Sequence, residues 1–394
     1  MKLKLWLLLG IIYLTFVALG LPDALIGSGW NLIREDFAYP LGALGFYTFS
    51  MYVMGILATS NTPRILRHFD TNKTILMALL AMAFSLFMMS LAPSFPLLIL
   101  AALPLGFGAG VIDMSVNHFL AAHYKPYHMN FLHAFYGLGV TVGPGVMALT
   151  LQEENWRAAF LIIGIILSVI AFLLLLSFPI WVKEVANGRL ETHQTLSFKA
   201  IRETPGVLKS TALFILLVHV ESMGGLWIAS YIFIIRGVTY AEAAAFTTVF
   251  FTAFTISRFL GSLLSLKLSS KRLIMLGQMF ILIAAVMLFF EIEGTLYYMV
   301  AVAFYGLGAA PMFPNMMVLS GKYFKGPHLS KIMSIQMTLG YVGFGVLTPL
   351  AGFVFQTFTV GLMPYLVAVY SVALLMITYT YVRHMEHRLE QKMG

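Results

Sequence analysis

The chain of 394 residues contains no cysteine, so disulfides and thiolate metal ligands are excluded. Charge is scarce as well: charged residues make up 10% of the chain, against about a quarter in soluble domains. Hydrophobic residues reach 60%. A chain this apolar and this poor in charge is not a soluble globular domain. The composition predicts an all-α integral membrane protein.

Several motifs of catalysis are also missing. Without a GxxxxGK[ST] phosphate loop, ATP-driven transport would need a separate subunit. No HExxH motif is present, and His118, His123, His128 and His133 recur every five residues, which turns each by about 140° from the last on a helix. No nucleophile and base converge. We therefore expect no enzyme activity, no metal site and no cofactor.

Lysine and arginine are concentrated in every second gap between the apolar runs. The intervening gaps carry acids such as Asp36, Glu154 and Glu293. Because cytoplasmic loops of membrane proteins retain basic residues, this alternation predicts that both termini are cytoplasmic. The net charge of +8 is then an orientation signal that also favours anionic lipid, and nucleic-acid binding is not expected.

Twelve apolar runs are long enough to cross the membrane, which takes about 20 helical residues. A polar segment, 183–208, is predicted to be a cytoplasmic linker between an N-terminal six-helix bundle, 1–182, and a C-terminal one, 209–394. The predicted spans are 6–33, 41–63, 73–92, 95–123, 127–150, 157–182, 209–236, 240–267, 272–291, 294–323, 329–356 and 361–383.

The two halves repeat at an offset near 200 residues. Gly106 recurs as Gly306 in the same register, and Asp23 in the first span has a counterpart in Glu221 of the seventh. Two parallel repeats related by an axis along the membrane normal form one large class of transporter. Its substrate site lies at the midplane between the halves. The repeat predicts the same pseudo-symmetric architecture here.

Residues 106–144 carry the most specific pattern, GFGAGVIDMSVNHFLAAHYKPYHMNFLHAFYGLGVTVGP. It is supported by VESMGGLWIASY at 220–231, ISRFLGS at 256–262 and APMFPNMMVL at 310–319. Together these segments resemble the major facilitator superfamily, and within it the fucose permease-like branch of sugar symporters, over nearly the whole chain. The resemblance implies alternating access, sugar as substrate, proton coupling and a place in the cell (inner) membrane.

Four ionisable residues fall inside the predicted spans: Asp23, Asp113, Glu221 and Arg258. Such residues are costly in the membrane, so function is the default hypothesis. Three acids face one arginine, and burial favours the protonated form of a carboxyl group that lacks a partner. Asp113, with Asn117 one turn later, matches the acid of the sugar permeases and is our preferred proton carrier. Glu221 is the second candidate.

Further residues are candidates for binding substrate. Trp227 and Tyr231 lie four apart on one helix face near Glu221, which predicts an aromatic platform beside an acid. Asp23 follows Pro22, which can break the helix and free backbone carbonyls beside the cavity. The resemblance places His133 and Tyr136 in the cavity, and Asn315 is expected there because nearby prolines bend the tenth span. Asn117 and Glu221 complete the candidates for binding substrate.

Glycine and proline mark the segments expected to move. Gly143 and Pro144 lie in the fifth span, and Pro349 lies at the matching place in the eleventh, where small residues permit close packing and proline bends a helix. Arg258 is expected to form a gating or packing ion pair rather than to contact substrate. The Gly-Pro element also resembles that of drug/proton antiporters.

The sequence therefore predicts a monomeric secondary active transporter surrounded by membrane lipid. We expect it to move a small polar solute, a sugar, in symport with a proton, with sodium as the alternative ion. Two other readings stay open: a drug/proton efflux antiporter and, more remotely, a membrane protein that transports nothing.

Overall fold

The structure is a computed structural model that describes residues 2–124, 127–181, 204–290, 292–324 and 327–391. These residues are almost entirely helical and form no strands. The predicted linker, 183–208, lies outside the described residues except for its last five. Its role as a boundary between domains stays a prediction.

The first half of the chain supplies the helices of one bundle. The short 3-10 helices η1 (Leu41–Ala43), η2 (Leu151–Glu153) and η3 (Phe178–Ile180) lie at the ends of longer helices. The α-helices are α1 (Lys2–Gly20), α2 (Leu25–Asp36), α3 (Leu44–Ile65), α4 (Thr71–Ser90), α5 (Phe95–His123), α6 (Tyr127–Thr150) and α7 (Trp156–Leu176).

The second half forms the other bundle. It includes a π-helix, η4 (Gly343–Leu347), and a 3-10 helix, η5 (Val360–Leu362). Its α-helices are α9 (Val207–Arg236), α10 (Tyr240–Leu264), α11 (Ser270–Phe289), α12 (Thr295–Ala309), α13 (Met312–Tyr323), α14 (Pro327–Val342), α15 (Thr348–Thr357) and α16 (Met363–Glu390).

Twelve helical segments among the described residues are long and apolar enough to cross a membrane, as predicted. Three of them are interrupted. α1 gives way to α2 around Pro22, α12 to α13 around Pro311, and α14 to α15 through the π-helix before Pro349. Breaks of this kind leave backbone groups without helical partners, which membrane proteins accept where the segment is buried or lines a cavity.

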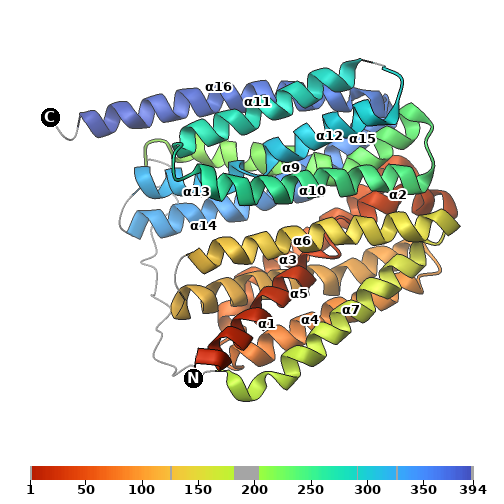
Figure 1. Cartoon of the computed structure of the whole chain (residues 1–394), viewed down its shortest axis with the longest axis horizontal. Helices are drawn as coiled ribbons and strands as arrows, with labels where there is room; N and C mark the ends of the chain where they lie inside the picture. Colours follow the sequence, from red (N-terminus) through yellow and green to blue (C-terminus); the bar gives the residue numbers. More distant parts are fainter. Residues whose placement is uncertain (1, 125–126, 182–203, 291, 325–326, 392–394) are drawn as a thin grey trace.

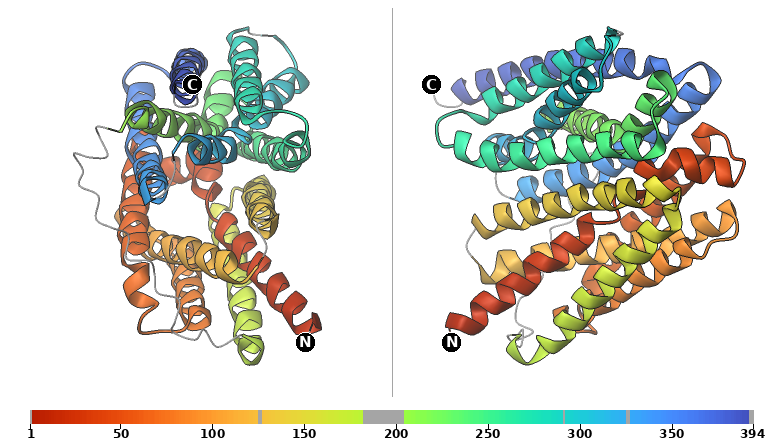
Figure 2. Two further views of the ribbon diagram at one scale, coloured as in Figure 1. Left: turned by 90° about the vertical axis from the view of Figure 1, so that its left-hand side faces the viewer. Right: turned by 45° about the vertical axis from the view of Figure 1, so that its right-hand side comes forward.

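The two bundles lie side by side with their helices running in roughly the same direction. Figure 1 shows the helices of the first half in the lower part and those of the second half in the upper part, except that α2 lies at the right, level with α10. The view from one end in Figure 2 separates the same two groups. Both ends of the described chain lie at one end of the molecule. Which side of the membrane that end faces stays a prediction from the charge pattern.

The glycine repeat has a structural cause. A Cβ atom at Gly106 of α5 would overlap the carbonyl oxygen of Met51 in α3, and one at Gly306 of α12 would overlap the carbonyl oxygen of Phe250 in α10. Helix–helix association in a membrane depends on such close backbone approach, because lipid is as apolar as the side chains. The same contact therefore holds the equivalent helix pair in each half.

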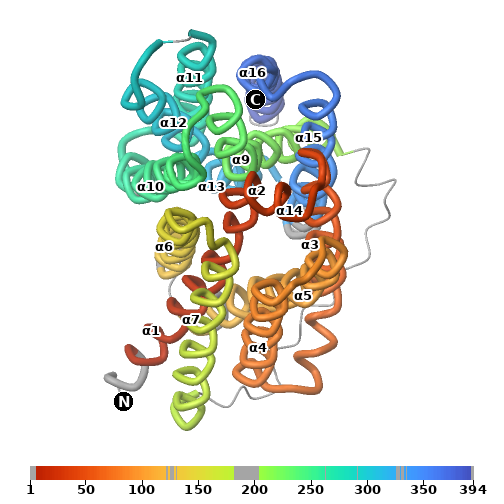
Figure 3. Tube along the Cα trace, turned by 90° about the vertical axis from the view of Figure 1, so that its right-hand side faces the viewer, coloured from red at the N-terminus to blue at the C-terminus, as the bar shows by residue number. Residues whose placement is uncertain are grey.

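The halves pack on each other along α6 and α10, and further contacts between them gather where α2 and α15 end. α2 packs on α9, and α15 packs on η1 and α3, and Figure 3 views the molecule from this end. Two hydrogen bonds join the halves here: Tyr240 donates its hydroxyl hydrogen to Glu35, and the Gly42 amide donates to Gln356 Oε1 at 2.9 Å. We call this region, defined by these four residues, the latch. It holds the halves together at the end away from the chain termini.

Candidate functional site

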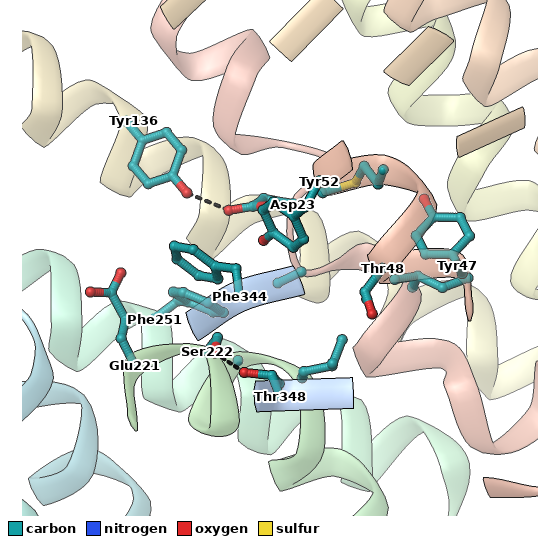
Figure 4. Close-up of a pocket in the computed structure, with 15 residues that line it drawn as sticks. Asp23, Tyr47, Thr48, Tyr52, Tyr136, Glu221, Ser222, Phe251, Phe344 and Thr348 are labelled. Carbon is teal, nitrogen blue, oxygen red and sulfur yellow. Dashed lines mark hydrogen bonds between the residues drawn. The ribbon is translucent and has the colours of Figure 1, made fainter. Parts of the chain in front are cut away.

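A cavity lies between the halves, toward the middle of the helices, and both halves supply its walls. Its empty space of about 550 Å³ includes space that is open to solvent. Figure 4 shows its polar and aromatic side chains pointing toward a common space. The lining residues are Asp23, Ala24, Ile26, Tyr47, Thr48, Met51, Tyr52, Tyr136, Glu221, Ser222, Gly225, Leu226, Phe251, Phe344 and Thr348.

Asp23 reaches this cavity from the break in the first span. α1 ends at Gly20 and α2 begins at Leu25, so Asp23 lies in the turn between them. Its carboxylate accepts a hydrogen bond from the Tyr136 hydroxyl of α6, which is visible in Figure 4. Gly139 of α6 allows the end of α1 to approach closely, because a Cβ atom there would lie 2.9 Å from the Leu21 amide nitrogen. Within the described residues, Asp23 has no ion-pair partner.

Glu221 enters from α9 and pairs with Arg258 of α10. The distance from Arg258 Nη2 to Glu221 Oε1 is 3.9 Å, and each side chain is 14% exposed. The guanidinium group also covers the Phe254 ring, 4.4 Å from its centroid, and donates from Nη1 to the His133 carbonyl oxygen at 3.4 Å. Arg258 therefore bridges the two halves beside the cavity. Its predicted role in gating stays untested.

A chain of polar groups forms the wall beside Glu221. Ser222 and Thr348 share a hydrogen bond, and Thr348 donates to the Gly343 carbonyl oxygen at 2.9 Å. Buried His219 contacts the Thr348 hydroxyl through Nδ1 at 3.0 Å. The π-helix after Gly343 sets the position of Thr348, because its wider turn shifts the residues that follow. The resulting wall offers hydroxyl oxygens to the cavity.

Aromatic rings form the remaining walls. Tyr52 of α3 stacks on Phe344 of the π-helix, with ring centroids 5.0 Å apart and planes 17° apart. Tyr47, Phe251 and Tyr136 add further rings, as Figure 4 shows. An aromatic ring beside hydroxyl and carboxylate groups suits a solute that has both apolar and polar faces.

The platform expected from Trp227 and Tyr231 does not form at the cavity. Trp227 is fully buried, packs edge-on against Phe355 with centroids 5.6 Å apart, and donates Nε1–H to the Thr348 carbonyl oxygen. The Tyr231 hydroxyl donates to the Leu288 carbonyl oxygen at 3.0 Å. At about 100° per residue, positions six and ten after Glu221 fall on a different face of α9. Trp227 and Tyr231 therefore share a helix face with each other but not with Glu221.

Asp113, the preferred proton carrier, lies on α5 outside the cavity lining. Asn117 donates from Nδ2 to Asp113 Oδ1 at 2.8 Å, so the pairing expected one turn apart is present. The described residues include no ion-pair partner for Asp113. Tyr341, whose ring centroid lies 6.2 Å from that of Tyr52, packs beside the cavity wall.

Asn117, an expected binding residue, lies outside the lining as well, and so do two others. Asn315 is 7% exposed, and its side-chain amide donates to the Pro311 carbonyl oxygen at 2.7 Å. This hydrogen bond stabilises the first turn of α13, the second part of the interrupted tenth span. The His133 ring packs edge-on against Phe16, with centroids 5.7 Å apart. Neither side chain reaches the cavity in this conformation.

The expected gating residues lie at close helix contacts. A Cβ atom at Gly143 would overlap the Leu21 carbonyl oxygen, and Pro144 follows within α6. Pro349 begins α15 and packs on Gly45 of α3, where an added Cβ would lie 2.9 Å from the proline ring. Gly143 and Pro144 therefore border the break at Asp23, and Pro349 lies where the halves meet.

Sequence reasoning missed most of the cavity wall. Two weak signals were available: Ser222 adjoins Glu221, and Tyr52 follows Thr48 by one helical turn inside the second span. Phe344 and Thr348 gave no signal, because the π-helix changes their register. The missed polar and aromatic residues are Tyr47, Thr48, Tyr52, Ser222, Phe251, Phe344 and Thr348.

Comparison with known proteins agrees with this architecture. The family profile described as Major Facilitator Superfamily matches residues 12–290 and 220–392. Bypass of stop codon protein 6 of Saccharomyces cerevisiae is 22% identical over 390 residues, covering 89% of this chain and 77% of the yeast protein.

Two solved structures are similar in fold. A crystal structure of a mutant of the nucleoside transporter NupG superposes with a TM-score of 0.79 at 15% identity, covering 96% of this chain and 99% of that one. A crystal structure of a D-xylose-proton symporter gives a TM-score of 0.80 at 14% identity, covering 96% and 98%. At such low identity the likeness concerns the fold alone.

Proposed function

The chain belongs to the Major Facilitator Superfamily and is a multi-pass integral membrane protein, and we propose that it imports a small polar solute, a sugar, in symport with a proton. The observation that carries this proposal is the cavity between the halves. Asp23 and Glu221, which occupy equivalent places in the repeat, both line it together with hydroxyl groups and aromatic rings. Carboxylates that accept hydroxyl hydrogens beside a ring suit a polyol.

Proton coupling is proposed to depend on Asp113 first and Glu221 second. Asp113 is held by the Asn117 amide and has no ion-pair partner within the described residues. A buried carboxyl group in this setting can bind and release a proton as its access to water changes. Glu221 forms an ion pair with Arg258, so protonation of the Glu221 carboxylate would weaken that ion pair. The similar fold of a D-xylose-proton symporter supports proton coupling as part of this proposal.

The latch fits one state of an alternating-access cycle. The charge pattern predicts that the latch end, which lies beside Asp36 and Glu154, faces the exterior. The structure then represents the carrier closed to the outside. Opening outward would require the Tyr240–Glu35 and Gly42–Gln356 bonds to break. We propose that the carrier works as a monomer in the cell membrane, with lipid around its apolar surface.

Transport by reconstituted variants tests the proposal. Asp113→Asn keeps the shape and the hydrogen bonds of the carboxyl group but cannot titrate. We expect exchange of labelled for unlabelled sugar to persist and accumulation driven by a pH gradient to vanish. Asp70→Asn, at an exposed acid outside the spans, is the matched control and should accumulate sugar normally. If Asp113→Asn still accumulates sugar, Glu221→Gln becomes the variant to examine.

Drug/proton antiport is the second candidate because of Asp23. Its carboxylate lacks an ion-pair partner in the described part of the chain and lies among aromatic rings, which suits an organic cation. The direction of proton movement separates the two functions. A symporter takes up protons with its substrate, whereas an antiporter releases them against it.

A further inference from the structure

We infer that the cavity recognises its substrate through hydrogen-bond acceptors, so the solute must bring donors, as hydroxyl or protonated amine groups, and must not be an anion. This inference rests on the proposed function, because it assumes that the cavity is the substrate site. It narrows the substrate class beyond a polar solute. It follows from where the hydroxyl hydrogens of the wall point.

A hydroxyl group has a single hydrogen to donate and two lone pairs to accept with. In the first half, these hydrogens are used inside the protein. The Thr48 hydroxyl donates to carbonyl oxygens of its own helix, those of Leu44 and Gly45, both at 3.2 Å. The Tyr47 hydroxyl donates to the Met89 sulfur at 3.6 Å, and the Tyr136 hydroxyl donates to Asp23.

The second half repeats this arrangement. The Thr348 hydroxyl donates to the Gly343 carbonyl oxygen at 2.9 Å, and the Ser222 hydroxyl donates to the His219 carbonyl oxygen at 2.9 Å or to Thr348. Both hydrogens are therefore held within the wall. What Ser222 and Thr348 can offer the cavity is lone pairs. A substrate that meets them must supply the hydrogen.

The charged groups act in the same direction. Asp23 brings a carboxylate, and Glu221 brings a second one that shares Arg258. Two acids and one arginine leave the cavity with a net negative charge when all three are ionised. Binding of a negatively charged solute there is strongly disfavoured. Tyr52 is the exception among the lining hydroxyls, because within the described residues its hydrogen is not given to another group. The wall thus offers one hydroxyl donor against many acceptors.

The inference can be tested by measuring solute binding to the purified protein. The probes are D-glucose and D-xylose, the amino sugar D-glucosamine, the acid D-glucuronate and fully O-methylated glucose, which keeps acceptors and loses every hydroxyl hydrogen. Acetylcholine and ethanolamine serve as a cation pair without and with hydrogen-bond donors. We expect at least one donor-bearing neutral or amine probe to bind. The O-methylated sugar leaves the acceptors of the wall unpaired, and D-glucuronate brings a negative charge to a negative cavity. Each should bind at least about tenfold more weakly.

A matched pair of variants tests the wall directly. Thr48→Val removes lone pairs that face the cavity, whereas Thr62→Val removes a buried hydroxyl of the same helix that donates to the Ala58 carbonyl oxygen away from the cavity. We expect Thr48→Val to weaken binding of the best probe about three- to tenfold. Thr62→Val should leave binding unchanged. Equal effects of the two variants would overturn the inference.

The outcomes of the probe series separate the inference from the proposed function. Tight binding of the O-methylated sugar overturns the donor requirement, and tight binding of D-glucuronate overturns the exclusion of anions. Either result leaves sugar transport standing. Binding of ethanolamine but of no sugar supports the donor requirement and overturns sugar as the substrate. Preference for acetylcholine over ethanolamine overturns the donor requirement and favours the drug antiporter. If no probe binds, both proposals fail.

Discussion

Replacing Trp227 by alanine should damage the fold rather than substrate binding. The ring is fully buried between α9 and α15, packs on Phe355 and approaches Gly352, where an added Cβ would overlap it. Its removal leaves a void on the order of 100 Å³, and at about 24 cal/mol per Å³ this costs roughly 2 to 3 kcal/mol. Losing the hydrogen bond to the Thr348 carbonyl oxygen adds about 1 kcal/mol.

Thermal unfolding of the purified protein measures this loss. We expect Trp227→Ala to lower Tm by about 5 °C or more and to leave the affinity of the protein that remains folded within about twofold. Phe251→Ala is the comparison, because that ring lines the cavity. It should weaken binding by roughly 1 to 2 kcal/mol, about five- to thirtyfold. A stable Trp227→Ala protein that has lost its affinity would refute this assignment of the two rings.

Three further predictions concern topology, the latch and the glycine repeat. Because the chain has no cysteine, single cysteine substitutions can be labelled without background. A membrane-impermeant thiol reagent added outside intact cells should label Glu153→Cys and spare Asp70→Cys. The reverse labelling pattern would show that the topology is inverted. Tyr240→Phe removes the hydrogen bond to partly exposed Glu35. Distances between spin labels should then show that the equilibrium shifts by up to about fivefold toward the state in which the halves are separated at the latch end. Tyr39→Phe at the same end should cause no shift. Gly106→Ala and Gly306→Ala should each destabilise the protein by about 1 to 3 kcal/mol through overlap with a carbonyl oxygen, and equal stability of Gly10→Ala, which has open space, is the control.

The fold could be predicted from the sequence because its signals are long and regular. Twelve apolar runs, separated by short polar gaps, define the spans to within a few residues at most ends. The offset between Gly106 and Gly306 identified the repeat, since each glycine is needed at the same backbone contact. These signals depend on the period of the helix and the thickness of the membrane. Neither depends on how the halves are rotated against each other.

The cavity was harder to predict because it depends on that rotation. Asp23, Tyr136 and Glu221 were expected at the site and line it, since charged and polar groups are rare inside a span. Trp227 and Tyr231 were expected on the same face of α9 as Glu221. They lie on another face, because the number of helical turns between them and Glu221 is not close to a whole number. Thr348 follows a π-helix, whose extra residue per turn no apolar pattern reveals. An aromatic residue in an apolar chain gives no sign of which neighbour it faces.

Proton movement during transport tests the central claim, symport of a polar solute with a proton, most directly. Proteoliposomes that contain the protein and an internal pH-sensitive dye are prepared without a pH gradient, and an inward gradient of the best-binding solute is then imposed. A symporter moves protons inward with the solute, so the account predicts acidification of the interior that a protonophore abolishes. Interior alkalinisation would show antiport, and solute uptake without any change in pH would contradict proton coupling.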